Sequence, residues 1–179
     1  MCKNNSGTYH STMKLYIKQK VFSWRDRFSI KDESGNNCFY AQGEILSWRR
    51  KLHLYNTSGH KVAYIYQKLF TFLPRYYIEI NGQTYVIVKE FTFFKQKYRI
   101  EGLPWTMQGN FIAHEYALYN NNTIHNDNTK IMSLSKHWFT WGDSYELDIP
   151  NPQNTLLCLC IALCVDCIQA DATAAQSSR

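Results

Sequence analysis

Short stretches in which hydrophobic and polar residues alternate follow one another along most of this chain, from residue 14 to residue 149. The alternation is clearest at residues 76–80 and 85–88, and turns rich in glycine and asparagine, such as residues 56–59 and 81–82, separate the stretches. A period of two residues broken by such turns is typical of antiparallel strands, and no amphipathic helix interrupts this region. The pattern therefore predicts an all-β fold.

One hairpin pattern recurs within this region. Residues 65–80 align without a gap onto residues 134–149, and shorter copies begin at Phe22, Leu46 and Thr92. Each copy is a strand with aromatic residues at its end, a short corner and a second, alternating strand, and a sixth, degenerate copy surrounds residues 105–113. Six hairpins correspond to about twelve strands, and a sheet of that size tends to close on itself. We predict a closed antiparallel barrel.

The chain ends in a helical segment, residues 155–170, whose apolar residues fall on every face. A helix that is apolar all round must be buried on all sides. The apolar run before Asp166 is shorter than the roughly 20 residues that a membrane span needs, so we expect a core helix rather than a span. A barrel of twelve strands is too wide for its own side chains to fill. We therefore predict that this helix occupies the centre of the barrel.

The chain of 179 residues is long enough for one domain with a sizeable core. We expect this domain to cover residues 14–170, between a disordered N-terminal extension at residues 1–13 and a flexible tail at residues 171–179, because both ends are polar. Either Met1 or Met13 could be the true start.

The corners of the repeated hairpins carry most of the basic residues. In a simple antiparallel meander these corners would all lie at one end of the barrel, while the opposite end would carry nearly neutral Gly/Asn turns. The net charge of +6 suggests an acidic partner such as phosphate or a membrane surface. The residues expected to bind such a ligand are Arg25, Arg27, Arg49, Arg50, Lys51, Arg75, Lys95 and Lys97. Asp26 and Asp143 would dilute this charge.

The sequence offers no constellation for catalysis. It contains no nucleophile elbow, no Walker loop and no dinucleotide-binding glycine motif, and its six histidines are scattered. Four of the six cysteines crowd the C-terminal helix, where we expect them to pack as small hydrophobic residues in a reducing cytosol. The alternative is a thiol face of Cys160, Cys164 and Cys167 for a soft metal. We predict no enzyme, no cofactor and no metal.

Asp166 is the one acidic residue within the apolar helix. A buried carboxylate needs a partner or a shifted pKa. We expect it near the mouth of the barrel, paired with an arginine or a backbone amide; the alternative is that it belongs to a small polar pocket there.

Three phrases, residues 16–20, 28–35 and 136–145, resemble the LURP-one-related family, as does the apolar C-terminal helix with its single acid. The resemblance covers roughly residues 14–170, and the chain looks like the bacterial members of the family. It implies the Tubby C-terminal-like fold, a twelve-stranded barrel around a hydrophobic helix. Tubby domains of this superfamily bind phosphoinositide headgroups through basic residues. No catalytic residue is established for the family, and the lipid-binding positions of Tubby domains cannot be matched one by one onto this chain.

Two hypotheses for function follow. The first is a non-enzymatic binding module that docks anionic phospholipid or phosphoinositide headgroups at a basic rim. The alternative is a cytoplasmic protein-interaction or structural scaffold without a lipid ligand. We expect a monomer that resides in the cytoplasm, peripherally at a membrane in the first case, with protein partners in the second. A nucleic-acid partner is not expected, because no known nucleic-acid module is present.

Overall fold

The structure is a computed structural model, and it describes residues 12–18, 28–44, 51–68, 75–90, 97–122, 127–139 and 142–177. Its strands are β1 (Met13–Lys18), β2 (Phe28–Lys31), β3 (Asn37–Gly43), β4 (Lys51–Asn56), β5 (Lys61–Lys68), β6 (Arg75–Ile80), β7 (Gln83–Glu90), β8 (Lys97–Glu101), β9 (Trp105–Asn110), β10 (Glu115–Asn122), β11 (Asp127–Phe139) and β12 (Gly142–Ile149). A 3₁₀ turn, η1 (Pro152–Asn154), leads into the helix α1 (Thr155–Ser177).

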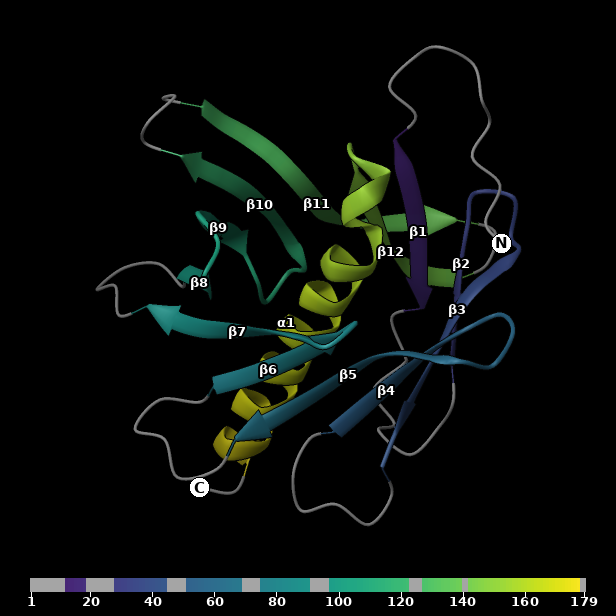
Figure 1. Ribbon diagram of the computed structural model, residues 1–179, viewed down its shortest axis with the longest axis horizontal. Helices are drawn as coiled ribbons and strands as arrows, with labels where there is room; N and C mark the ends of the chain where they lie inside the picture. Colours follow the sequence, from purple (N-terminus) through teal and green to yellow (C-terminus); the bar gives the residue numbers. More distant parts are fainter. Residues whose placement is uncertain are drawn as a thin grey trace.

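The twelve strands form one closed barrel in which each strand pairs antiparallel with its neighbours in the chain, and β12 pairs with β1 (Figure 1). This order confirms the predicted barrel and the assumed meander. Buried inward side chains alternate with less buried outward ones along strands such as β4, where Leu52 and Leu54 are buried and His53 is half-buried. A slip of one residue would turn the apolar side chains outward, so burial specifies the register.

The seam between β1 and β12 closes the barrel. Inside, Leu15 lies opposite Leu147. Outside, Lys14 Nζ lies 2.9 Å from Glu146 Oε1, and the Tyr16 hydroxyl donates to Glu146 Oε2 at 3.0 Å. The seam thus combines apolar packing on the inner face with polar cross-strand pairs on the outer face, both of which stabilise antiparallel sheets.

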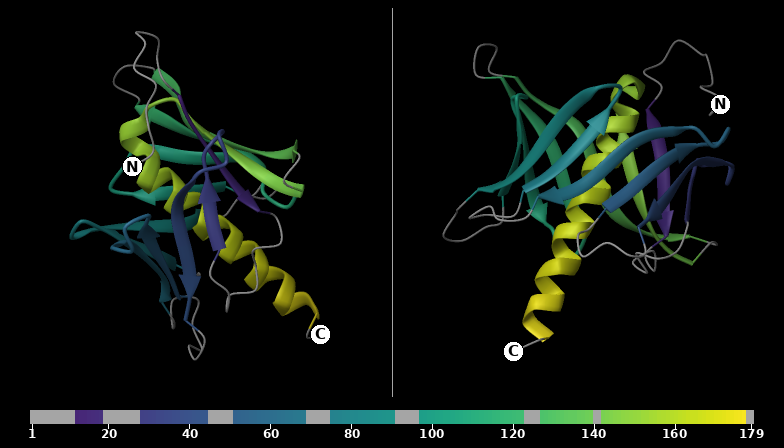
Figure 2. Two further views of the ribbon diagram at one scale, coloured as in Figure 1. Left: turned by 90° about the vertical axis from the view of Figure 1, so that its right-hand side faces the viewer. Right: turned by 60° about the horizontal axis from the view of Figure 1, so that its bottom comes forward.

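The helix α1 runs through the barrel and leaves it at the end opposite to the one where it begins (Figure 2). The 3₁₀ turn η1 leads directly into the first residue of α1. The Asn151 side chain accepts a hydrogen bond from the Gln153 amide at 3.0 Å, and Thr155 Oγ1 donates to the Pro152 carbonyl at 2.6 Å. Residues 158–167 are buried on every face. The helix continues to Ser177, beyond the predicted end at residue 170, because alanines in this segment favour helix.

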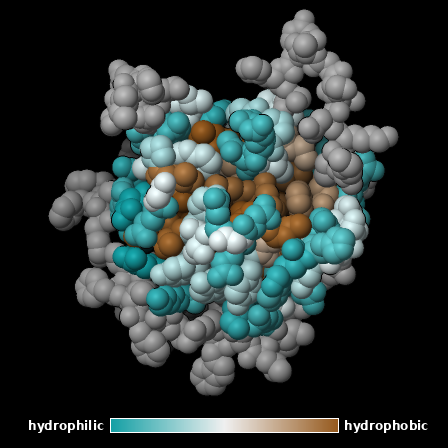
Figure 3. Space-filling view, in the orientation of Figure 1, coloured by the Kyte–Doolittle hydropathy of each residue, from teal (hydrophilic) through white to brown (hydrophobic). Residues whose placement is uncertain are grey.

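The helix is the centre of a single hydrophobic core to which every strand contributes buried or half-buried side chains. Apolar side chains are visible in the middle of the face shown in Figure 3, over α1, and polar side chains surround them. Burying one leucine or isoleucine contributes about 1.5–3 kcal/mol. The core around α1 is therefore a main source of stability.

The stretch Pro152–Ala170 is long and apolar enough to cross a membrane by composition alone. In this fold its central residues are enclosed by the barrel instead, as predicted. The helix cysteines Cys158, Cys160, Cys164 and Cys167 are buried thiols that form no disulfide. Cys38 is disulfide-bonded, which the expectation of packed, reduced cysteines did not include.

Candidate functional site

The candidate site is the end of the barrel at which α1 leaves it, and we call it the helix-exit rim. Because the strands alternate in direction around a closed meander, β1, β3, β5, β7, β9 and β11 end at this rim, and β2, β4, β6, β8, β10 and β12 begin there. The rim residues described at strand ends include Gly43, Lys51, Lys68, Arg75, Glu90, Lys97, Asn110 and Glu115.

Three of the eight predicted ligand-binding residues are described, and each begins a strand at the helix-exit rim: Lys51 in β4, Arg75 in β6 and Lys97 in β8. The other five, Arg25, Arg27, Arg49, Arg50 and Lys95, lie outside the described residues. Lys68, which was not predicted, ends β5 at the same rim with its ammonium group 5.7 Å from the centre of the Tyr77 ring.

Each of the three described residues contacts a carboxylate on the outer wall. Lys51 Nζ lies 2.8 Å from Glu44 Oε2, Arg75 lies 3.6 Å from Glu101, and Lys97 lies 3.2 Å from Glu90. The hydrogen bond from Lys51, followed by that from His53, holds the pKa of Glu44 below its ordinary value. Exposed ion pairs contribute only about 0–1 kcal/mol. These cations can therefore exchange a protein carboxylate for an external anion at little cost.

Inside the rim, a buried acid meets a histidine. Asp166, in the part of α1 that approaches the rim, is 3% exposed, and its Oδ1 lies 3.0 Å from Nδ1 of His114, although the two groups are not aligned for a hydrogen bond. The His114 ring stacks on Tyr145 with 4.3 Å between centroids. The partner of Asp166 is thus a histidine side chain, not the arginine or backbone amide expected. The two residues are far apart in sequence, and no local pattern indicates the pair.

The turn between β9 and β10, residues 111–114, presents His114 to Asp166. His114 has a φ of +54°, which is uncommon for a residue with a side chain, and its amide donates to the Phe111 carbonyl at 3.2 Å. Burial raises the pKa of Asp166 above its ordinary value, and the nearby His114 offsets part of that increase. The hydroxyl of Tyr116 is buried beside this pair without a hydrogen-bond partner among the described residues, and burial raises its pKa.

The raised pKa of Asp166 predicts a pH-dependent stability. A carboxyl whose pKa is raised on folding contributes stability that is fully present below its ordinary pKa, near 3.8, and that is lost as the pH rises through the raised value. Asp166→Asn removes this titration. The free energy of unfolding of the variant, relative to that of the wild type, should therefore increase by about 1–2 kcal/mol when the pH is raised from 4 to 7. Urea unfolding at several pH values in this range measures the difference.

The matched variant is His114→Asn, because asparagine tolerates a positive φ. It removes the group that lowers the pKa of Asp166, so the buried carboxylate becomes more costly at neutral pH. We expect a loss of about 1–3 kcal/mol at pH 7 and a smaller loss at pH 4. Equal changes at both pH values in both variants would show that Asp166 does not titrate against His114.

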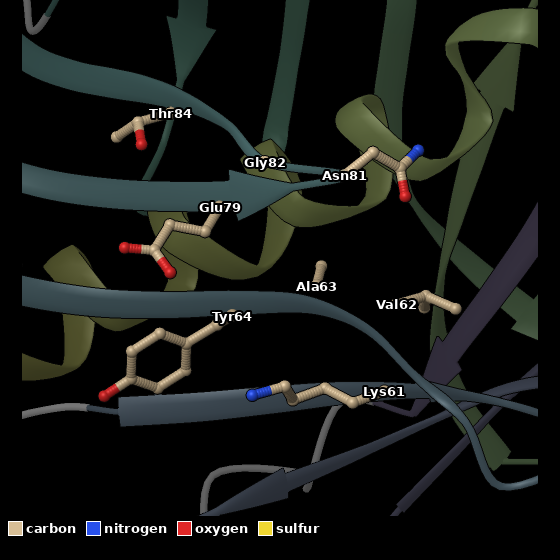
Figure 4. Close-up of a pocket in the computed structure, with 8 residues that line it drawn as sticks. All are labelled: Lys61, Val62, Ala63, Tyr64, Glu79, Asn81, Gly82 and Thr84. Atoms are coloured by element: carbon tan, nitrogen blue, oxygen red, sulfur yellow. The ribbon is translucent and has the colours of Figure 1, made fainter.

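A polar hollow lies on the outer wall, away from the rim (Figure 4). Lys61, Tyr64 and Glu79 place an ammonium, a phenol and a carboxylate around it. The Tyr64 ring belongs to a stacked row, with 4.7 Å to His53 and 5.1 Å to Tyr66. Because its faces are occupied by these neighbours, the row stabilises the sheet and offers the hollow a hydroxyl rather than a flat stacking surface.

In the part of the chain that the structure describes, no three His, Cys, Asp or Glu side chains group closely enough to hold a metal ion. Burial raises the pKa of Cys160 and Cys164, so their sulfurs are held as thiols rather than as the thiolates that bind metals. The helix cysteines therefore act as packing residues.

These features define a class of protein: a closed twelve-stranded antiparallel barrel around one C-terminal helix, the Tubby-like fold. The X-ray structure of a protein from Arabidopsis thaliana is similar, with a TM-score of 0.60 over 88% of this chain and 91% of that one. Its sequence identity of 14% supports the fold alone. The model of the LURP-one-related family matches residues 13–166, and the chain belongs to this family.

A curated relative supports the same assignment. The chain is 36% identical over 157 residues to the uncharacterised protein YxjI of Bacillus subtilis (strain 168), a match that covers 87% of this chain and 93% of that protein. The family model and this relative confirm the resemblance to the LURP-one-related family that the sequence indicated. Proteins of this family and fold are generally non-enzymatic.

Proposed function

We propose that this protein is a non-enzymatic binding module that docks anionic phospholipid headgroups, phosphoinositides among them, at the helix-exit rim. On this proposal it is a cytoplasmic monomer that associates peripherally with a membrane surface. The family and the fold support a binding module; the choice of ligand rests on charge.

The observation that carries the proposal is the strand order. In the closed meander, β4, β6 and β8 begin at the helix-exit rim and β5 ends there. Lys51, Lys68, Arg75 and Lys97 are the described basic residues at these strand ends. The predicted binding residues Arg25, Arg27, Arg49, Arg50 and Lys95 lie outside the described residues, and their contribution to this surface remains a prediction from the sequence. A cluster of four to eight basic residues near a membrane surface attracts anionic lipid by about 1 kcal/mol for each Lys or Arg.

The experiment is co-sedimentation of the purified protein with vesicles. Neutral phosphatidylcholine vesicles are compared with vesicles that contain phosphatidylglycerol or a phosphoinositide, at low and high salt. We expect binding to the anionic vesicles only, weakened by salt because screening shortens the reach of exposed charges. Arg49→Glu together with Arg50→Glu should weaken binding by at least about a hundredfold, since two positive charges become negative and the net charge falls by four units.

The matched control is Lys61→Glu together with Lys130→Glu. Both lysines are exposed, and both lie in the first half of strands that begin at the opposite end of the barrel. This double variant changes the net charge by the same amount as Arg49→Glu with Arg50→Glu, but away from the rim. Binding should remain within a few-fold of the wild type. Equal losses in the two double variants would point to net charge rather than the rim. No binding of the wild type to any vesicle would instead favour the protein-interaction scaffold.

A further inference from the structure

Ile112 has an unusual position in this fold. It lies in the turn between β9 and β10, at the helix-exit rim, and 77% of its surface is exposed. Among the residues described by the structure, it is the only large hydrophobic side chain that is exposed. A single exposed isoleucine needs no explanation by itself. Two further features distinguish Ile112: its turn is anchored to the core, and it lies at the same end of the barrel as the basic residues of the rim.

The turn is anchored on both sides of Ile112. Before it, Phe111 is 2% exposed and packs between Tyr116, at 5.0 Å, and the edge of Tyr98, at 4.8 Å. After it, the Ala113 amide donates to Asn110 Oδ1 at 3.1 Å. His114 then contacts the buried Asp166 of α1. Phe111 and His114, on either side of the exposed pair Ile112 and Ala113, contact the interior and fix the turn, so Ile112 is held outward.

We propose that Ile112 is a membrane anchor that inserts into the acyl boundary of an anionic bilayer when the helix-exit rim docks. This inference rests on the proposed function, because it names the apolar contact that accompanies the headgroup contacts. The His114–Asp166 contact and the buried Phe111 act as the rigid base of the anchor. A preformed turn loses little conformational freedom on binding, so more of the free energy of burying the side chain is kept.

The size of the surface favours a bilayer over a protein partner. A stable protein interface buries about 1,200–2,000 Å² in total, far more than one side chain offers. A bilayer accepts a single apolar group together with electrostatic attraction, and two weak signals combined give stable attachment where one does not. The exposed neighbour Glu115 would remain at the headgroup level and limit the depth of insertion.

The test uses Ile112→Ser in the vesicle assay with phosphatidylglycerol vesicles. Apolar insertion is not screened by salt, whereas headgroup attraction is. We therefore expect about tenfold weaker binding at low salt and loss of the binding that the wild type retains at high salt. Ile112→Leu should bind like the wild type. Thermal unfolding should be unchanged in both variants, because the side chain is exposed.

The matched control moves the isoleucine instead of removing it. Thr57 is exposed in the turn between β4 and β5, at the opposite end of the barrel. Ile112→Ser combined with Thr57→Ile keeps the overall hydrophobicity, and it should bind as weakly as Ile112→Ser alone. Wild-type binding by either variant would overturn the inference and leave the basic rim intact. If the wild type binds no vesicle, the proposed function and this inference fall together.

Discussion

Ile161→Asp should abolish folding. Ile161 lies in the middle of α1 with no exposed surface and contacts the core to which the barrel strands contribute. The substitution removes about 1.5–3 kcal/mol of apolar burial. It also places a carboxylate without a partner in the core, which costs several kcal/mol more even after relaxation. The sum is comparable to the 5–15 kcal/mol that stabilises a typical domain.

Circular dichroism and the soluble yield without detergent measure this result. Two controls belong with it. Ile161→Val should lose only about 0.5–1.5 kcal/mol, and Gln153→Asp, which introduces the same acid at an exposed position just before the helix, should unfold like the wild type. A soluble Ile161→Asp variant with a native melting temperature would show that the barrel does not depend on α1 as its core.

Gly109→Ala should be the most damaging small substitution outside the helix. Gly109, in β9, has a φ of +143°, and a Cβ there would lie 2.5 Å from Tyr116 Cα and closer still to the Glu115 carbonyl oxygen. Both groups belong to the backbone of β10, so no side-chain rotation can relieve the clash. Strand β10 must therefore move away from β9. We expect a loss of about 2–4 kcal/mol in urea unfolding.

Gly82 provides the matched control. It has a φ of +78° in the turn between β6 and β7, and a Cβ there would meet nothing within 4 Å. Gly82→Ala should lose only the roughly 1 kcal/mol that a positive φ costs a residue with a side chain. Similar losses in the two variants would show that conformational freedom, and not the close approach of β10, explains the need for Gly109.

Gly109→Ala should also disturb the helix-exit rim. Gly109 lies opposite Tyr116 in the register of β9 and β10, and the turn between these strands carries Ile112 and His114. A displaced β10 would move both residues. If Ile112 is a membrane anchor, the Gly109→Ala protein that remains folded should lose the salt-resistant part of its vesicle binding, as we expect for Ile112→Ser.

Most of the fold could be predicted because its signals are local. Alternation places the side chains of a strand on two faces whatever the strand pairs with, so Tyr76, Ile78 and Ile80 point inward as expected. Residues 158–167 are apolar on every face of a helix, which leaves burial on all sides as the stable solution. The repeated hairpins indicate the strand number, whereas the meander was assumed and is confirmed by the strand order.

The candidate site was predictable only in part. The sequence placed basic residues at one end, and Lys51, Arg75 and Lys97 do begin strands there. Their carboxylate partners were missed: Arg75 contacts Glu101 on β8, two strands away. Such a contact depends on the stagger between strands, which the alternation of a single strand does not encode.

By itself, the sequence determined which side chains face the core, that the sheet closes and that the C-terminal helix fills it, because periodicity and apolar content act within each element. Only the tertiary structure decided that His114 meets Asp166 and that Ile112 remains exposed on an anchored turn. Those two facts depend on how far α1 travels through the barrel and on the register of β9 against β10. Both quantities arise from the packing of distant segments, and no stretch of the chain specifies them alone.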